Sequence, residues 1–275
     1  NMASRTVFEI VFLTGRRKMT TFNKLNLGIA VGSFAIFQLS YHVLSSWLSS
    51  RLTSGFNNLD QKKKIEWNTR TVSTFHALVV EIFCVYILLY DEAINADQFY
   101  LPVLYFFLDL LLIIWHWKAI GDVFFVTHHV LALYSYYIVL DRGVLAYFAN
   151  FRLLAELSTP FVNQRWFFEA LGYSKASKAN IINGLLMTIM FFLGRIIVIP
   201  IYYNSMASEF GTEAYYRLGF VAQTAWIVSS IILDIINLMW MVKITRGCYK
   251  VIRLIGQEEA KTHKNGKSDN TKKNI

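Results

Sequence analysis

The stretch VFFVTHHVLALYSYYIVL, from Val123 to Leu140, places two adjacent histidines, His128 and His129, inside an apolar segment. The segment is close to the roughly 20 residues that an α-helix needs to cross the hydrocarbon of a bilayer. An ionisable side chain at that depth costs at least a few kcal/mol, so such residues usually face an interior cavity or a partner. More ionisable residues fall within or at the edges of the other apolar stretches: His76, Glu81, Asp109, His116, Arg152, Glu156, Arg195 and Asp234. We therefore expect membrane helices that enclose a polar interior.

The composition predicts an all-α polytopic membrane protein. Of the 275 residues, 55% are hydrophobic and 16% aromatic, above the roughly 45–50% apolar content of soluble domains. We expect about seven transmembrane helices, at Leu27–Leu48, Thr71–Tyr90, Tyr100–Trp117, Val123–Leu140, Val144–Val162, Ile181–Tyr203 and Leu218–Val242. The fifth is the weakest, because it contains Arg152 and Glu156 and ends at Pro160. The alternative is six spans with this segment re-entrant.

The basic residues predict the orientation. Lysines and arginines gather between the first two spans and after the seventh, whereas the loop Asp91–Gln98 has neither. The positive-inside rule then places the first connecting loop and the C-terminus in the cytosol. The net charge of +9 does not indicate a nucleic-acid partner, because no folded soluble surface presents it. Arg16-Arg17-Lys18 disagrees with this orientation unless Met19 is the start, so we leave residues 1–26 out of the fold as an N-terminal segment that need not be native.

The C-terminal sequence suggests a location. Lys272 and Lys273 stand fourth and third from the last residue and resemble the dilysine retrieval signal of endoplasmic-reticulum membrane proteins. That signal works from a cytosolic tail, which the loop charges predict independently. We expect residues 258–275 to form a disordered basic tail.

The orientation also gives the depth of each polar group. At a rise of 1.5 Å per residue, the candidate cavity residues gather in the cytosolic half of the membrane: His76, His116, His128, His129, Arg152, Glu156, Asp234 and Asn237. Glu81 falls near mid-membrane and Arg195 toward the far side. Arg152 and Glu156, four residues apart, are most simply a paired charge. His128 and His129 are about 100° apart on a helix, so we expect one to face the cavity and the other to contact a neighbouring helix.

Three smaller signals complete the survey. Six histidines with a single pair are too few for a membrane di-iron enzyme, and classical zinc spacing is absent, so we expect no metal site. Cys248, beside Arg246 and Lys250, is a candidate for palmitoylation. Gly28-x-x-x-Gly32 fits a helix-pairing motif and gives weak support for a homodimer.

Three stretches carry a resemblance to a known family. Phe56–Trp67 (FNNLDQKKKIEW), His128–His129 and Asn150–Trp166 (NFRLLAELSTPFVNQRW) resemble the TLC-domain membrane proteins, over about Thr20 to Gln257. The resemblance implies an endoplasmic-reticulum protein with six helices in a barrel and a peripheral first helix, the transmembrane domain occupying residues 27–257. Ceramide synthases and the translocating-chain-associated membrane proteins share this domain.

The ceramide-synthase motif is present only in part. Those enzymes follow their paired histidines with a His-Asp-x-x-Asp block, and the corresponding positions here are Asn150, Phe151 and Leu154. Acyl transfer needs a base and a group that orients and charge-balances it. Histidine can be the base, but the acidic half is missing unless Asp109, Glu156 or Asp234 replaces it from another helix.

Three functions remain open. The first is a lipid-handling role in lipid homeostasis, without a cofactor, in which the barrel admits an acyl chain from membrane lipids and the polar cluster meets a headgroup. The second is an N-acyltransferase with acyl-CoA as cosubstrate and His128, His129 and Asp109 as catalytic residues. The third is a proton-coupled transporter. The sequence shows no inverted repeat, which argues against this function. For the first two, His128, His129 and Asp109 must line one connected void that is reachable from the cytosolic leaflet.

Overall fold

The computed structural model describes residues 24–90, 100–142 and 145–272, and every element in these ranges is helical. Three helices are long and apolar enough to cross a membrane, Gln61–Ile87, Lys178–Glu209 and Glu213–Arg253, and Val123–Val139 is a shorter apolar helix. The predicted fold class is therefore confirmed: the chain is an all-α polytopic membrane protein.

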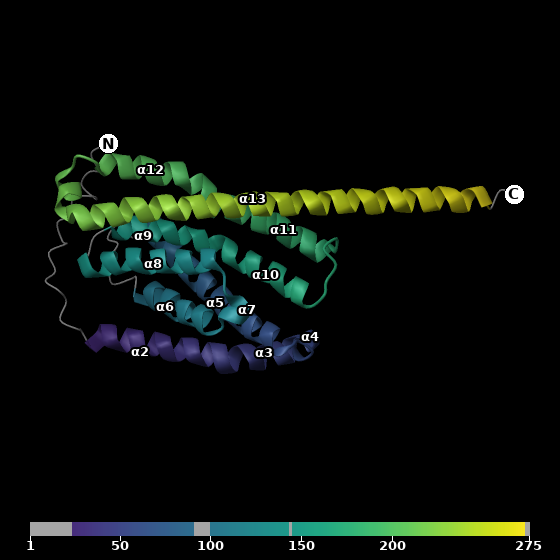
Figure 1. The fold of residues 1–275 in the computed structure, drawn as a ribbon, viewed down its shortest axis with the longest axis horizontal. Coiled ribbons are helices and arrows are strands. Elements are labelled where there is room, and N and C mark those ends of the chain that lie inside the picture. The colour runs from purple at the N-terminus through teal and green to yellow at the C-terminus, as the bar shows by residue number, and fades with distance from the viewer. Residues whose placement is uncertain (1–23, 91–99, 143–144, 273–275) are drawn as a thin grey trace.

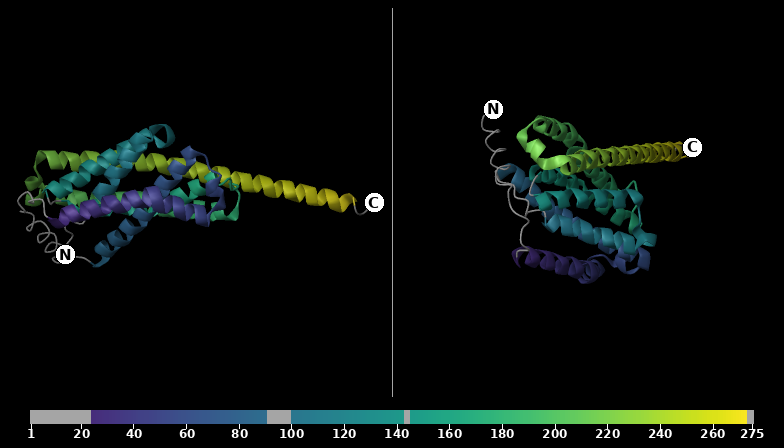
Figure 2. Two further views of the ribbon diagram at one scale, coloured as in Figure 1. Left: turned by 90° about the horizontal axis from the view of Figure 1, so that it is seen from below. Right: turned by 60° about the vertical axis from the view of Figure 1, so that its left-hand side comes forward.

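Six helical segments contact one another in a closed ring. Figures 1 and 2 show the helices packed side by side from three directions. In ring order they are α5 (Gln61–Tyr90), α6 (Tyr100–Trp115), α8 (Val123–Arg142), α13 (Glu213–Lys272), α11 (Lys178–Phe191) and α10 (Thr159–Ala170). Contacts between α10 and α5 close the ring, and α9 (Ala146–Leu153) lies against α5 and α8. The ring provides an interior that several helices line together.

The first helix lies outside this ring, as expected. α2 (Lys24–Leu39) packs against α6 and continues through a π-helical turn into α3 (Ser45–Leu52). Three hydrogen bonds tie α3 to α5: Ser45 Oγ donates to Asn68 Oδ1, Asn68 Nδ2 donates to Ser46 Oγ, and Trp67 Nε1 donates to Ser49 Oγ, each at 2.8 Å. Short helices α4 (Ser54–Asn57) and α7 (Trp117–Ile120) turn the chain between longer ones.

The fifth segment is longer than predicted and changes its winding. α9 passes into a 3₁₀ helix at Leu154–Ser158 and then into α10, which ends at Ala170 rather than at Val162. Pro160 does not end it, because this proline lies in the first turn of α10, where its missing N–H is not needed. The 3₁₀ stretch matters for the site, because it changes the direction in which Glu156 points.

The sixth segment approaches this 3₁₀ helix closely. α11 continues through a π-helix at Phe192–Ile197 into α12 (Val198–Glu209). At Gly194 a Cβ atom would lie 2.5 Å from the carbonyl oxygen of Leu154, so only glycine permits this approach. The contact brings the next residue, Arg195, against the 3₁₀ helix.

α13 extends well past the predicted end of the seventh span at Val242. It is interrupted by Gly219, which has a φ of 73°, and then runs to Lys272. Figure 1 shows its last turns projecting beyond the other helices. The structure thus continues a helix into the tail that the composition suggested to be disordered, while Lys273–Ile275 lie outside the described residues.

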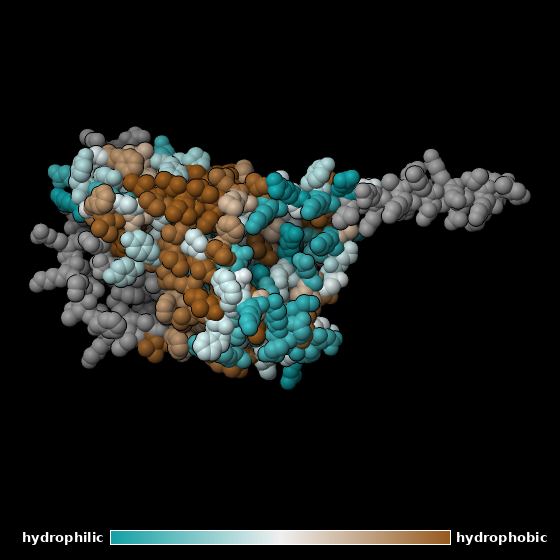
Figure 3. Space-filling view, viewed as in Figure 1, coloured by the Kyte–Doolittle hydropathy of each residue, from teal (hydrophilic) through white to brown (hydrophobic). Residues whose placement is uncertain are grey.

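The outer surface carries large apolar side chains. Ile82 on α5 and Val221 on α13 are 70% and 60% exposed. On the face seen in Figure 3, hydrophobic residues cover the middle and hydrophilic ones lie toward the ends. A soluble protein seldom exposes so large a contiguous apolar surface, whereas hydrocarbon around the ring accounts for it.

Candidate functional site

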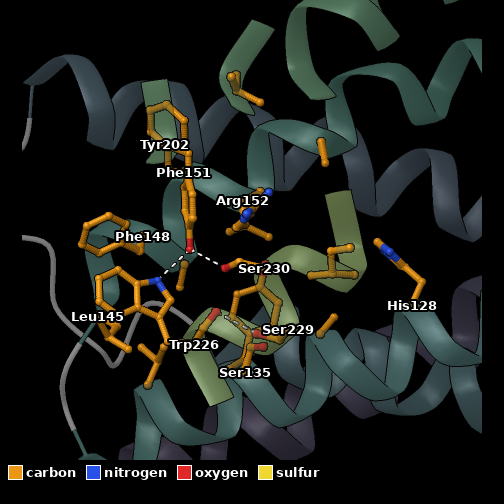
Figure 4. A pocket seen from close by; sticks show the side chains of 18 of the residues that line it. His128, Ser135, Leu145, Phe148, Phe151, Arg152, Tyr202, Trp226, Ser229 and Ser230 are labelled. Atoms are coloured by element: carbon orange, nitrogen blue, oxygen red, sulfur yellow. Dashed lines mark hydrogen bonds between the residues drawn. The ribbon is translucent and has the colours of Figure 1, made fainter. Parts of the chain in front are cut away.

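An apolar cavity lies inside the ring, and we call it the inner chamber. Its volume is about 80 Å³, and its lining comes from α8, α9, the 3₁₀ helix, the π-helix, α12 and α13. Most of the lining is apolar, including Ala132, Ile138, Val139, Leu145, Phe148, Phe151, Ala225 and Trp226. Trp226 Nε1 donates to the Tyr202 hydroxyl at 2.8 Å, and that hydroxyl lies 2.9 Å from Ser230 Oγ (Figure 4). These polar atoms bond to one another, so they interrupt the apolar lining little.

A second, more polar cavity of about 140 Å³ adjoins the chamber, and we call it the waist. Asp109 and His129 line it. His128, Glu156 and Arg195 line both the waist and the inner chamber. The two cavities are therefore separated by charged and titratable side chains.

The third cavity, the mouth, has a volume of about 400 Å³. Its charged lining consists of Arg70, Arg165, Arg195, Lys243 and Glu169. The residues that it shares with the waist are Arg70, Ser73, Phe125, Thr159, Asn163, Arg195 and Trp240. Arg195 thus lines all three cavities. The chamber, the waist and the mouth thus adjoin one another, and their linings change from mostly apolar in the chamber to basic in the mouth.

His129 is held on two sides. Its Nδ1 lies 2.7 Å from the carbonyl oxygen of Phe125, and its Nε2 lies 2.8 Å from Oδ2 of Asp109 on α6. A carbonyl oxygen only accepts, so Nδ1 carries a proton. The Nε2–Asp109 contact then also contains a proton, on the ring or on the carboxyl group. His129 is the histidine that contacts a neighbouring helix.

His128 faces the cavities. It lines both chamber and waist, and the centre of its ring lies 5.7 Å from that of Trp240. Both histidines line the waist, but only His128 also lines the inner chamber, while His129 contacts Asp109 on α6. Figure 4 shows His128 at the end of the inner chamber away from Trp226 and Leu145.

The predicted Arg152–Glu156 pair is wrong. Arg152 donates from Nη2 to Asp234 Oδ2 at 3.0 Å and from Nη1 to Oδ1, and its guanidinium lies 3.8 Å from the centre of the Tyr202 ring. The 3₁₀ winding places Glu156 about 100° around the axis from Arg152, instead of about 40° in an α-helix. Arg152 and Asp234 join α9 to α13, while Glu156 faces the chamber and the waist.

Arg195 lies in this cluster, contrary to the prediction that it sits toward the far side. Its side chain is buried; Nε donates to Ser158 Oγ at 3.1 Å, and Nη1 donates to Asn237 Oδ1 at 3.0 Å. Span boundaries explain the error, because α13 continues past Val242 and the π-helix alters the register of the sixth segment. Glu156 and Glu81 act on Arg195 electrostatically, but no carboxylate among the described residues lies within 4 Å of its guanidinium.

Of the remaining predicted residues, some are buried or line a cavity, and others lie outside the three cavities or outside the described part of the chain. His76 is buried on α5 and interacts electrostatically with His129. Asn237 lines the inner chamber. His116 lies between α6 and α7, outside the three cavities. Cys248 lies on α13 and packs against α11, with its Sγ 3.1 Å from Thr188 Oγ1. The side chain of Lys272 and all of Lys273 lie outside the description.

The sequence analysis missed Trp240 and Asn163. Trp240 lines the waist and the mouth, and Asn163 accepts from Arg70 Nη1 at 3.1 Å and donates to Thr74 Oγ1 at 3.0 Å. Trp240 lies within the apolar seventh span, where an aromatic residue gives no sign of a site. Nothing in the pattern around Asn163 distinguished it from other polar residues.

Sequence comparisons identify the family. A sequence model of the TLC domain matches residues 66–246. The chain belongs to the TLC-domain family. It is 59% identical over 260 residues to TLC domain-containing protein 4-B of Xenopus laevis, covering 90% of this chain and 99% of that protein. It is 52% identical over 258 residues to the human TLC domain-containing protein 4, covering 90% and 98%. No solved structure matches.

Among TLC-domain proteins, the ceramide synthases carry an acidic block that this chain replaces. Asn150 at the first position is buried; its Nδ2 donates to the Cys84 carbonyl at 3.4 Å, and its own carbonyl accepts from Cys84 Sγ at 3.1 Å. Phe151 adds an apolar ring to the inner chamber. These residues therefore support the packing and the apolar lining, and the carboxylate beside the histidines is Asp109 from α6.

Proposed function

We propose that this TLC-domain protein binds membrane lipid inside its helical ring and serves lipid homeostasis in the endoplasmic-reticulum membrane, with its C-terminus in the cytosol. The acyl chain would enter the inner chamber and the headgroup would lie at the waist and the mouth. The carrying observation is that an apolar cavity directly adjoins a cavity lined by His128, Glu156 and Arg195. An apolar compartment joined to a polar one fits an amphiphile.

The cavity volumes limit how the lipid can fit. The chamber of about 80 Å³ is smaller than the roughly 150 Å³ apolar cavity that binds benzene in an engineered protein. It accommodates a short part of an acyl chain, so a longer chain must extend through the waist toward the mouth. The three cavities adjoin one another at Arg195, so the chain would pass beside this side chain.

The test fills the chamber. Ala225 lines it, whereas Val228, one turn further along α13, is exposed on the outer face. Lipids that remain with the purified protein are measured by native mass spectrometry for wild type, Ala225→Phe and Val228→Phe. We expect Ala225→Phe to lose long-chain lipid and Val228→Phe to retain it. Overpacking can itself destabilise a core. Bound lipid is therefore also measured for Ala149→Leu, at a second chamber position, and a thermal unfolding curve is recorded for each variant.

Equal long-chain lipid on folded wild type, Ala225→Phe and Ala149→Leu would refute binding in the chamber. Absence of bound lipid from the wild type in every mild detergent would refute the proposed function as a whole.

The second candidate is an acyl-CoA-dependent N-acyltransferase, and the His129–Asp109 pair beside His128 favours it. With both ring nitrogens of His129 engaged, His128 is the residue that would meet a thioester in the cavity. A ring nitrogen would bond to the acyl carbon as the carbon–sulfur bond breaks, and the departing thiolate of CoA would take the imidazole proton and leave as the thiol.

Intact-mass measurement after exposure to long-chain acyl-CoA tests this reaction. An acyl-sized increment on wild type and His42→Ala, but not on His128→Ala, is expected if the reaction occurs. His42 is the control because it is exposed on the first helical segment, outside the ring. A missing increment on wild type refutes a stable acyl-enzyme, and a turnover assay with amine acceptors then tests direct transfer.

A further inference from the structure

We propose that the mouth is a phosphate site that holds the headgroup of a phospholipid with a phosphate monoester, Arg195 forming the base of the site. This inference rests on the proposed function and specifies the class of lipid. It concerns residues that the ceramide-synthase resemblance does not include, since Arg165, Arg195 and Lys243 lie outside the histidine pair and the acidic block.

The first argument is the state of the Arg195 side chain. Nε and Nη1 bond to neutral partners, Ser158 and Asn237, and Nη2 makes no hydrogen bond with the described residues. The Cζ atom of Arg195 lies 5.0 Å from the centre of the Phe191 ring and 5.6 Å from that of Trp240. A buried guanidinium normally has an anionic partner. Here the group opens onto the cavities instead.

The second argument is that neighbouring charged groups are already paired. Asp109 bonds to His129, Asp234 to Arg152, and Glu66 to Arg70 at 2.8 Å. These carboxylates are therefore already engaged with other side chains. Glu156 faces the chamber and the waist but does not line the mouth, and Glu81 lines none of the three cavities. On the mouth side, an anion can reach Arg195 without meeting either carboxylate.

The third argument is the charge of the mouth itself. Arg165 on α10 and Lys243 on α13 are exposed and line it, and neither has an ion-pair partner among the described residues. The Arg165 guanidinium reaches across to α13, where a Cβ at Gly247 would lie 3.5 Å from its Nη1. With Arg195 they give three unpaired cations against one carboxylate, Glu169. This excess suits a doubly charged phosphate.

The lining also indicates that the phosphate belongs to a lipid. Apolar side chains make up much of the mouth: Phe125, Val162, Met187, Phe191, Trp240 and Ile244. A soluble phosphate would leave them in contact with water, whereas an acyl chain attached to the headgroup would cover them on its way to the chamber. We therefore assign the site to a membrane lipid rather than to a free phosphate compound.

A charge-matched comparison tests the proposal. The rim variant is Arg165→Gln with Lys243→Gln. The control is Arg246→Gln with Lys250→Gln, which removes two exposed cations of α13 that do not line the mouth. Arg195→Lys, which retains the charge and loses the forked donor geometry, is the third variant. Binding of phosphatidic acid and of phosphatidylcholine to each full-length protein in neutral detergent is measured by native mass spectrometry.

Wild type and control should bind phosphatidic acid preferentially, and the rim variant should lose that preference by about tenfold or more, as loss of charge-assisted bonds predicts. Arg195→Lys should weaken it as well. Equal losses in rim and control variants would mean general attraction to basic surface and would overturn the site. Glycerol 3-phosphate that competes as strongly as phosphatidic acid would overturn the lipid assignment.

The proposal and the lipid-binding function fail in different ways. If both lipids bind equally and only Ala225→Phe removes them, the chamber binds acyl chains and the phosphate site is refuted. If neither lipid binds the wild type, the lipid-binding function itself is refuted.

Discussion

The imidazole of His129 joins α8 to α6 through Asp109, with Nε2 2.8 Å from Oδ2, while its Nδ1 lies 2.7 Å from the carbonyl oxygen of Phe125. Both polar groups are buried, and each satisfies the other. The link fixes the orientation of the ring and leaves the adjacent His128 directed toward the chamber and the waist. One histidine of the pair thus positions the helix that presents the other.

This link predicts a strong effect of removing one partner. Asp109→Ala should lower the free energy of unfolding by about 3–5 kcal/mol, because it leaves a buried polar group without its partner. The double variant Asp109→Leu with His129→Leu should recover part of that loss, since no uncompensated group remains. Thermal unfolding in detergent measures both, with Glu213→Gln, in an exposed pair, as the control. A double variant less stable than Asp109→Ala would contradict the coupling.

The partner of Arg152 gives a second prediction. Asp234→Asn should destabilise the protein by several kcal/mol, because a buried guanidinium loses its charged partner. Glu156→Gln should change stability by less, since Glu156 has no ion pair within 4 Å among the described residues. Unfolding curves of the two variants, which each remove one negative charge, decide between the partners. If Glu156→Gln proves the more damaging, the i, i+4 pair is the real one.

The sequence predicted the helical ring better than the pairings inside it. Hydropathy locates helices because a spanning helix must satisfy its backbone internally and present apolar side chains to lipid. The Arg152–Asp234 pair depends on the 3₁₀ winding at Leu154–Ser158, and the position of Arg195 depends on a π-helix. Local changes of winding leave little trace in hydropathy. A periodicity of 3.6 therefore paired Arg152 with Glu156, and the expected depth placed Arg195 away from the cluster.

The His129–Asp109 contact is a second feature that the sequence could not predict. The sequence identified both residues as functional candidates, because each is costly at membrane depth. Spacing along the chain indicates only which residues are neighbours within one helix. Contacts between helices require the packing of α6 against α8, which no spacing along the chain specifies.

Gly194 provides a third prediction with a control on the same segment. A Cβ at Gly194 would lie 2.5 Å from the Leu154 carbonyl oxygen. A Cβ at Gly184 would have none of the described atoms within 4 Å, apart from its chain neighbours and the backbone of its own helix. Gly194→Ala should therefore separate the π-helix from the 3₁₀ helix and lower stability by at least about 1–3 kcal/mol. Gly184→Ala should be neutral or stabilising by up to about 1 kcal/mol. Equal melting temperatures for the two variants would show that the approach is not tight.

The fourth prediction concerns Lys272 and Lys273, which resemble a retrieval signal of the endoplasmic reticulum. Lys272→Ser with Lys273→Ser should move the full-length protein to post-Golgi membranes, because the signal needs both lysines at fixed positions from the end of a cytosolic tail. Lys264→Ser with Lys267→Ser removes the same charge from the same tail and should leave the distribution unchanged. Fluorescence microscopy with an N-terminal tag measures both, since a C-terminal tag would displace the signal. If neither variant moves, residence in the endoplasmic reticulum depends on the transmembrane region instead, and if both move, it depends on tail charge rather than on lysine position.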